Sequence, residues 1–232
     1  MKTICLSFIY LCLLSLQINV TSSSSELSYP GCGYDLRQTV VGTVMNGKET
    51  NPHQYPWMVF ICGQAKIDEN GKIKCGEACG GTLISPRYIL TAAHCVVGDI
   101  QDIFVVLGSH SISESLANMD YVFLSKIVFY PYYGYKGSLK EAPDIALLEL
   151  EENATFGPKV NAICLPSEND VNEVLDQLVD KKALVAGWGV VAYDNDGVKT
   201  IKLTSDTLME AFVTIRSNEW CKNRKNYEFL KR

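Results

Sequence analysis

The sequence has little excess charge, no long apolar run beyond its N-terminal end, and no paired set of metal-binding cysteines. A net charge of -5 over 232 residues gives no reason to expect nucleic acid or an anionic membrane surface as a partner. Cys75 and Cys79 have the spacing of half a zinc site, but no second pair of cysteines or histidines stands at a matching interval. No acidic cluster indicates calcium, so neither a metal nor a cofactor is expected.

The N-terminal end has the pattern of a secretory signal peptide. Lys2 precedes an apolar run over residues 4–16, which is too short to span a bilayer. Small residues follow, and we expect cleavage near Val20 or Ser22, so that residues 1–22 form the signal peptide. A short membrane anchor is the alternative interpretation. The signal predicts a secreted, extracellular protein that is free of the membrane after cleavage.

Secretion changes the interpretation of the nine cysteines. Cys5 and Cys12 would leave with the signal peptide, and the others would pair as disulfides in an oxidising compartment. The cysteines that remain are Cys32, Cys62, Cys75, Cys79, Cys95, Cys164 and Cys221. Because their number is odd, we expect at least one of them to lack a partner within the chain.

From residue 55 onward, short β-like runs alternate with turn residues. The runs are PWMVFI, GTLISPRYILTAA, DIFVVLG, YVFLSKIVFY, DIALLEL, ALVAGWGVVA and LMEAFVTI. Many short strands separated by Gly, Pro and Asn predict an all-β barrel or sandwich. Residues 171–179 depart from this pattern, because their apolar side chains recur at helical spacing and predict a short surface helix.

The segment CGQAKIDENGKIKCG, residues 62–76, predicts a β-hairpin. Its tip is expected at Glu69, Asn70 and Gly71, where Asn-Gly supports a tight turn because both residues tolerate positive φ. Cys62 and Cys75 would face each other across the two arms, so a disulfide could close the loop.

Three motifs in order along the chain indicate the chemistry. TAAHC places His94 at the end of an apolar run, and DIALLEL places Asp144 at the start of an apolar strand. A carboxylate in such a position can orient an imidazole and stabilise its protonated form. GWG, residues 187–189, ends a strand in the second half. Together these motifs resemble the chymotrypsin-like (trypsin-fold) serine proteases, and the resemblance covers about residues 30–221.

The resemblance implies an all-β fold of two antiparallel β-barrels with the active site in the cleft between them. His94 matches the general base, which takes a proton from a serine hydroxyl and returns it to the leaving amine. Asp144 matches the carboxylate that orients this base. The implied activity is that of a secreted serine endopeptidase working through an acyl-enzyme. Its expected partners are protein or peptide substrates, protease inhibitors and an activating protease.

The resemblance also implies two disulfides, and the hairpin adds a third that many relatives lack. The expected bonds are Cys79–Cys95, Cys32–Cys164 and Cys62–Cys75. Cys221 would be the unpaired cysteine, because its partner in the family is missing from this sequence. The sequon NAT at Asn153 predicts N-glycosylation in a loop after the DIALLEL strand.

The segment VMNGKETNPHQYPW is similar to the mature N-terminus of the family. Val44 would become the new N-terminal residue after cleavage behind Thr43, which makes residues 23–43 a propeptide and residues 44–232 the protease domain. Most relatives are cut after Arg or Lys. Either a protease without tryptic specificity activates this chain, or activation does not happen.

The nucleophile of the family lies in a GDSGGP motif, and residues 1–232 contain neither GDSGG nor G-x-S-x-G. The serines after Asp144 are Ser167, Ser205 and Ser217, and none has that context. The domain is therefore expected to be truncated at its C-terminal end, with an incomplete second barrel, no oxyanion hole and no activity.

Three hypotheses about the nature of the chain are compatible with the missing GDSGG motif. The chain is a fragment or truncated product of a working endopeptidase, or it is a natural short form. A short form would be a non-catalytic protease homologue that acts by binding, as a decoy or regulator of proteolysis. The third hypothesis is an unrelated secreted β-domain.

Overall fold

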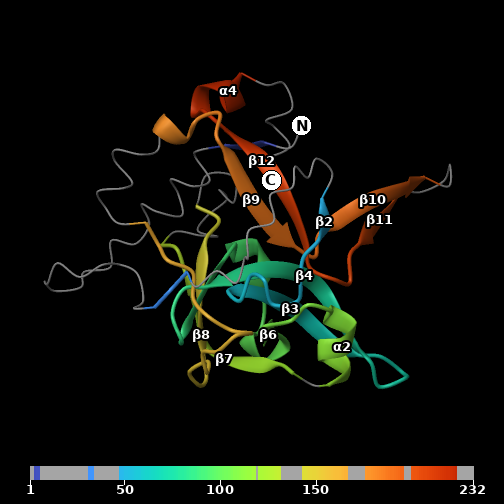
Figure 1. The fold of residues 1–232 in the computed structure, drawn as a ribbon. Helices are drawn as coiled ribbons and strands as arrows, with labels where there is room; N and C mark the ends of the chain where they lie inside the picture. Colours follow the sequence, from blue (N-terminus) through green and yellow to red (C-terminus); the bar gives the residue numbers. More distant parts are fainter. Residues whose placement is uncertain are drawn as a thin grey trace, which may run out of the picture.

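A computed structural model of the chain describes residues 3–5, 31–33, 47–118, 120–131, 143–166, 176–195 and 200–223, and consists mainly of β-strands (Figure 1). The strands are β1 (Thr3–Cys5), β2 (Lys48–Glu49), β3 (Met58–Ile67), β4 (Ile73–Leu83), β5 (Tyr88–Thr91), β6 (Phe104–Leu107), β7 (Val122–Phe129), β8 (Ala146–Leu150), β9 (Lys182–Gly187), β10 (Val190–Asn195), β11 (Thr200–Thr204) and β12 (Met209–Arg216). The helices are the 3-10 helices η1 (Ala93–Val96), η2 (Ile100–Asp102) and η3 (Asp176–Leu178) and the α-helices α2 (Ile112–Ala117) and α4 (Asn218–Lys222).

Six strands close into a barrel in the order β3-β4-β5-β8-β7-β6, and every neighbouring pair is antiparallel. This barrel occupies the lower part of Figure 1. Its interior holds a cluster of fully buried aliphatic side chains, among them Ile61, Ile89 and Leu148. The prediction of an antiparallel β-barrel in the first half of the chain is confirmed.

The first part of strand β3, residues 58–63, is buried on both of its faces. Val59 and Ile61 point into the barrel, whereas Phe60 and Cys62 belong to a second cluster that also contains Trp188. Successive side chains of a strand point to opposite sides, so an unbroken apolar run is required when both sides are covered. This explains why β3 begins as an apolar run without the alternation of a half-exposed strand.

The second half of the chain forms an open sheet and a two-stranded ribbon. Strand β12 pairs with β9 along one edge and with β1 and β2 along the other, and β10 pairs with β11. Trp188 joins this half to the barrel. Its ring meets Phe60 edge-on, and its Nε1 donates a hydrogen bond of 3.1 Å to the carbonyl of His110. Within the described residues the second half closes no barrel, as the fold prediction stated.

The hairpin of β3 and β4 differs from the predicted tight turn. Ile67 pairs with Ile73, so the loop contains residues 68–72 and is wider than the expected tip at residues 69–71. The Oδ1 atom of Asp68 accepts hydrogen bonds from the backbone N–H groups of Asn70 and Lys72, each at 2.9 Å. Gly71 has φ +75°, but Asn70 lies outside the positive-φ region. The Asp68 side chain organises a wider loop that the Asn-Gly signal alone does not reveal.

Several predictions concern residues that the structure describes in part or not at all. Of the predicted helix 171–179 only the end is described, and there Asp176–Leu178 forms a 3-10 helix. Of the predicted signal peptide, Thr3–Cys5 is described as β1, which runs parallel to the end of β12. Within the described part of the chain, no helix has the length and apolar character needed to cross a membrane.

Candidate active site

The pairing of β5 with β8 brings the two predicted catalytic residues together. Thr91 lies opposite Ala146 in this antiparallel pair. His94 lies three residues after Thr91, in helix η1, and Asp144 lies two residues before Ala146. Strand pairing therefore brings the ends of two segments fifty residues apart close together, and Asp144 contacts His94 directly.

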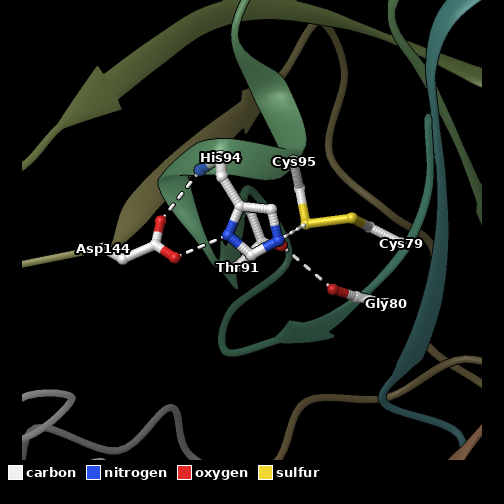
Figure 2. The surroundings of a disulfide bond; sticks show 6 residues. All are labelled: Cys79, Gly80, Thr91, His94, Cys95 and Asp144. Atoms are coloured by element: carbon white, nitrogen blue, oxygen red, sulfur yellow. Dashed lines mark hydrogen bonds and ion pairs between the residues drawn. A yellow bond between two sulfur atoms is a disulfide. The ribbon is translucent and has the colours of Figure 1, made fainter. Parts of the chain in front are cut away.

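Asp144 holds His94 at two points (Figure 2). Its Oδ1 atom accepts a hydrogen bond of 2.8 Å from the backbone N–H of His94, and its Oδ2 atom lies 2.5 Å from the ring Nδ1. An ionised carboxylate can only accept, so Nδ1 carries the proton and Nε2 presents its lone pair. The ring is thus fixed in the tautomer that a general base requires.

The opposite edge of the ring faces a disulfide. The Nε2 atom of His94 lies 3.5 Å from the Sγ atom of Cys95, which is bonded to Cys79 of β4 (Figure 2). The His94 side chain is 61% exposed, so solvent or a substrate can reach Nε2. The arrangement therefore offers an accessible base that is held on one side by a carboxylate and on the other by a disulfide.

Sequence reasoning missed one residue that supports this arrangement. Thr91, at the end of β5, donates a hydrogen bond of 2.9 Å from Oγ1 to the carbonyl of Gly80, next to Cys79 (Figure 2). This bond ties β5 to β4 directly behind the loop that carries His94. A threonine in a strand has a strong packing reason to be there, so nothing in the sequence distinguishes this role.

The structure contains the three expected disulfides. The bonds Cys32–Cys164, Cys62–Cys75 and Cys79–Cys95 have Cα–Cα separations of 5.0, 5.1 and 6.0 Å. The expectation that Cys221 is unpaired is wrong, because Cys221 is disulfide-bonded. That expectation assumes the loss of Cys5 and Cys12 with the signal peptide, whereas residues 1–232 include both cysteines.

The described serines that follow Asp144 are hydrogen-bonded to groups other than His94. Ser205 donates its hydroxyl to the carbonyl of Thr207 at 2.7 Å, and Ser217 caps helix α4 by accepting from the N–H of Trp220 at 3.1 Å. Among the described residues, no serine hydroxyl is hydrogen-bonded to His94.

The remaining predicted positions lie in loops or outside the description. Ser167, Thr43 and Val44 fall outside the described residues. Asn153 lies in the loop after β8 and is exposed, as an attachment point for a glycan must be.

Comparisons with known proteins agree with this geometry. A sequence model of a family, described as Trypsin, matches residues 44–231. A chymotrypsin from Phaedon cochleariae is 33% identical over 181 residues, which cover 77% of this chain and 57% of that protein. The venom serine protease Bi-VSP from Bombus ignitus is 32% identical over 210 residues, which cover 89% of this chain and 53% of that protein. The chain thus spans about half the length of these curated relatives.

A solved structure shares the fold. Neuropsin, a serine protease expressed in the limbic system of mouse brain, superposes with a TM-score of 0.54 at 26% sequence identity. The match covers 77% of this chain and 68% of that structure.

Proposed function

The chain belongs to the trypsin family of serine proteases, and from this premise we propose that His94 and Asp144 are the general base and the orienting carboxylate of a serine endopeptidase. The observation that carries the proposal is the hydrogen bond between His94 Nδ1 and the Asp144 carboxylate. It leaves Nε2 free to accept a proton, and the carboxylate stabilises the imidazolium that then forms.

The reaction that this pair supports is acyl transfer. His94 Nε2 takes the hydroxyl proton of a serine while the serine oxygen attacks a peptide carbonyl, and the ring then gives this proton to the leaving amine. Proteins or peptides are the proposed substrates, and protease inhibitors are proposed as binding partners.

We propose that residues 1–232 alone do not complete this reaction. They contain no GDSGG motif, and Ser205 and Ser217 are hydrogen-bonded to other groups. In the first form of the proposal, a longer product of the same gene supplies the serine and the oxyanion hole. In the second, favoured by the same missing motif, the short chain is secreted and acts by binding inhibitors or substrates. Sequencing the native transcript beyond codon 232 distinguishes them, because only the first requires a downstream GDSGG segment.

The role of His94 can be tested without any catalytic turnover. In ¹⁵N-labelled protein, the neutral ring of His94 is expected to carry its proton on Nδ1, with a hydrogen-bonded proton signal that disappears in Asp144→Ala. His53, whose Nδ1 faces the carbonyl of Gly108 at 2.9 Å, provides an internal control that the substitution leaves unchanged. A His94 ring that carries its proton on Nε2 would contradict the proposed role.

Activity itself provides the second test. The 232-residue chain should not react with a fluorophosphonate that labels nucleophilic serines, and neither should its His94→Ala variant. In a longer form that contains the serine, His94→Ala should abolish labelling. Asp144→Asn should lower kcat by about 10⁴-fold, the scale of the corresponding change within this family. Labelling of the 232-residue chain that vanishes in His94→Ala would show that the short form is active after all.

Secretion and activation are further parts of the proposal. We propose removal of residues 1–22 on secretion and a later cut between Thr43 and Val44. N-terminal sequencing of the protein recovered from the medium of expressing cells tests both cuts. A mature chain that begins with Met1 would contradict secretion by a cleaved signal, and an active form that begins elsewhere than at Val44 would contradict the activation site.

A further inference from the structure

The outer end of the β3–β4 hairpin carries two lysines directly opposite each other. Lys66 of β3 pairs with Lys74 of β4, so both side chains project from the same face of the hairpin. Like charges in directly opposite positions of a β-sheet repel each other and lower stability. Within the described part of the chain, Lys66 forms no ion pair, so the fold itself does not neutralise its charge.

This face of the hairpin points away from the protein interior. On the other face, Ala65 and Ile73 pack against the second hydrophobic cluster. Successive residues of a strand point to opposite sides, so Lys66 and Lys74 project toward solvent. Lys66 is exposed, and the side chain of Lys74 is 72% exposed. The Cys62–Cys75 disulfide joins the two arms, so the lysines lie on a frame that is already ordered.

The acidic residues of the hairpin do not cancel this charge. Asp68 Oδ1 accepts two backbone N–H groups of the loop, and its Oδ2 lies 3.3 Å from Lys74 Nζ. The Asp68 side chain is only 13% exposed, whereas Lys74 keeps most of its surface free. Lys72 and Glu69 are both exposed in the same loop. Residues 63–76 therefore carry three lysines against two acidic residues, in a chain whose net charge is -5.

The hairpin leaves the barrel beside the loop that carries His94. Gly63, at the base of the hairpin, lies so close to this loop that a Cβ atom at its position would stand 2.9 Å from the carbonyl oxygen of Cys95. Lys66 follows three residues later, which is about 10 Å along a strand. An extended polypeptide of about six residues is therefore long enough to reach from His94 to Lys66.

We propose that Lys66 and Lys74, with Lys72 beside them, bind an acidic segment of the proteins that reach His94 as substrates or inhibitors. This inference rests on the proposed function of His94. A carboxylate placed between the two opposed lysines accepts charge-assisted hydrogen bonds from both ammonium groups. It also relieves their mutual repulsion, so the partner restores the stability that the free hairpin lacks.

A synthetic peptide tests this surface directly. A dye-labelled peptide of alternating glutamate and aspartate should bind the 232-residue chain in a fluorescence anisotropy titration, and its counterpart of glutamine and asparagine should not. Added salt should weaken the binding, because it screens exposed charges. Lys66→Gln/Lys74→Gln should weaken it by about tenfold or more. Lys126→Gln/Lys181→Gln removes the same charge from two exposed lysines elsewhere and should bind the peptide as the parent does.

Two further variants separate binding from stability. Lys66→Glu turns the repelling pair into an attractive one, so the melting temperature should rise by about 1–4 °C while peptide binding is lost. Ile67→Ser changes an exposed residue on the opposite face of the hairpin and should leave binding unchanged. Equal binding by the parent and by Lys66→Gln/Lys74→Gln would overturn the proposal. Binding to phosphatidylserine vesicles in place of the peptide would overturn it too.

The link to His94 is tested in a longer, active form of the chain. Of two peptide substrates that differ only in an acidic stretch, the acidic one should have the lower KM. Lys66→Gln/Lys74→Gln should remove this difference and leave kcat unchanged. Equal KM values in the parent would show that the lysines do not serve substrates at His94. The anisotropy titration involves no serine, so its outcome is independent of the proposed proteolysis.

Discussion

The contact between the first barrel and β12 depends on a buried carboxylate, and this feature gives the most specific stability prediction. The side chain of Glu210 is 7% exposed and receives three donors. Lys48 Nζ lies at 3.2 Å and Gln54 Nε2 at 3.4 Å, and the hydroxyl of Tyr55 donates the third hydrogen bond. Gln54 and Tyr55 belong to the segment that leads into β3 of the barrel, whereas Lys48 lies in β2, which pairs with β12 in the sheet that also contains Glu210.

Tyr55→Phe removes one of these donors and leaves the ring in place. A hydrogen bond to a charged group contributes about 1.5–3 kcal/mol to stability. Tyr55 is 4% exposed, so water cannot easily replace the lost hydroxyl. We therefore expect the free energy of unfolding to fall by about 1.5–3 kcal/mol. For a chain of this size, about 2–4 °C of melting temperature accompanies each kcal/mol, which predicts a decrease of about 3–12 °C.

The measurement is urea unfolding followed by circular dichroism, with the melting temperature as a second readout. Tyr88→Phe is the matched control, because Tyr88 is 39% exposed on β5, and its change should stay within about 0.5 kcal/mol. The double variant Tyr55→Phe/Glu210→Gln should be less destabilised than the sum of its parts, since both substitutions weaken one interaction. If Tyr55→Phe were as mild as Tyr88→Phe, the conclusion that Glu210 holds the two halves together through this hydrogen bond would be wrong.

Three further predictions concern titration and modification. Burial acts to raise the pKa of Asp206, but hydrogen bonds from Ser111 and Ser113 outweigh it and lower the pKa below its ordinary 3.8. This carboxylate therefore stabilises the fold above pH 3.8, and the stabilisation is lost as the pH falls through its folded pKa. In acid unfolding followed by circular dichroism, Asp206→Asn should lack this loss of stability. Burial lowers the pKa of His53 below its ordinary 6.5, so the unfolded chain binds the proton first, and stability should fall as the pH drops below 6.5. Urea midpoints measured at several pH values should therefore depend less on pH in His53→Gln than in the parent chain. Identical pH profiles would contradict the explanation by burial. The protein secreted by eukaryotic cells should lose mass on treatment with an N-glycosidase, and Asn153→Gln should abolish the difference.

The barrel and the histidine–aspartate pair were predictable because their information is local or periodic. Apolar runs of strand length mark β3, β6 and β8, and TAAHC and DIALLEL each place one chemical group at the end of such a run. The antiparallel pairing of β5 with β8 then brings His94 and Asp144 to the same edge of the barrel, where they contact each other.

The contacts between the two halves were not predictable for the opposite reason. Glu210 and Tyr55 are separated by 155 positions, and neither lies in a pattern that names its partner. A glutamate between apolar residues in LMEAFVTI indicates only that one face of a strand differs from the other. The pairing of Cys221 was not predictable either, because the number of cysteines shows whether all of them can pair but not which ones do.

Three independent constraints fix the position of His94. Strand register places the loop, the backbone N–H of His94 binds Asp144 Oδ1, and the bond from Cys95 to Cys79 ties the loop to β4. Because the first two do not involve sulfur, the imidazole should keep its place and tautomer when the disulfide opens. The tautomer that the proposed base function requires therefore depends on Asp144 rather than on the disulfide.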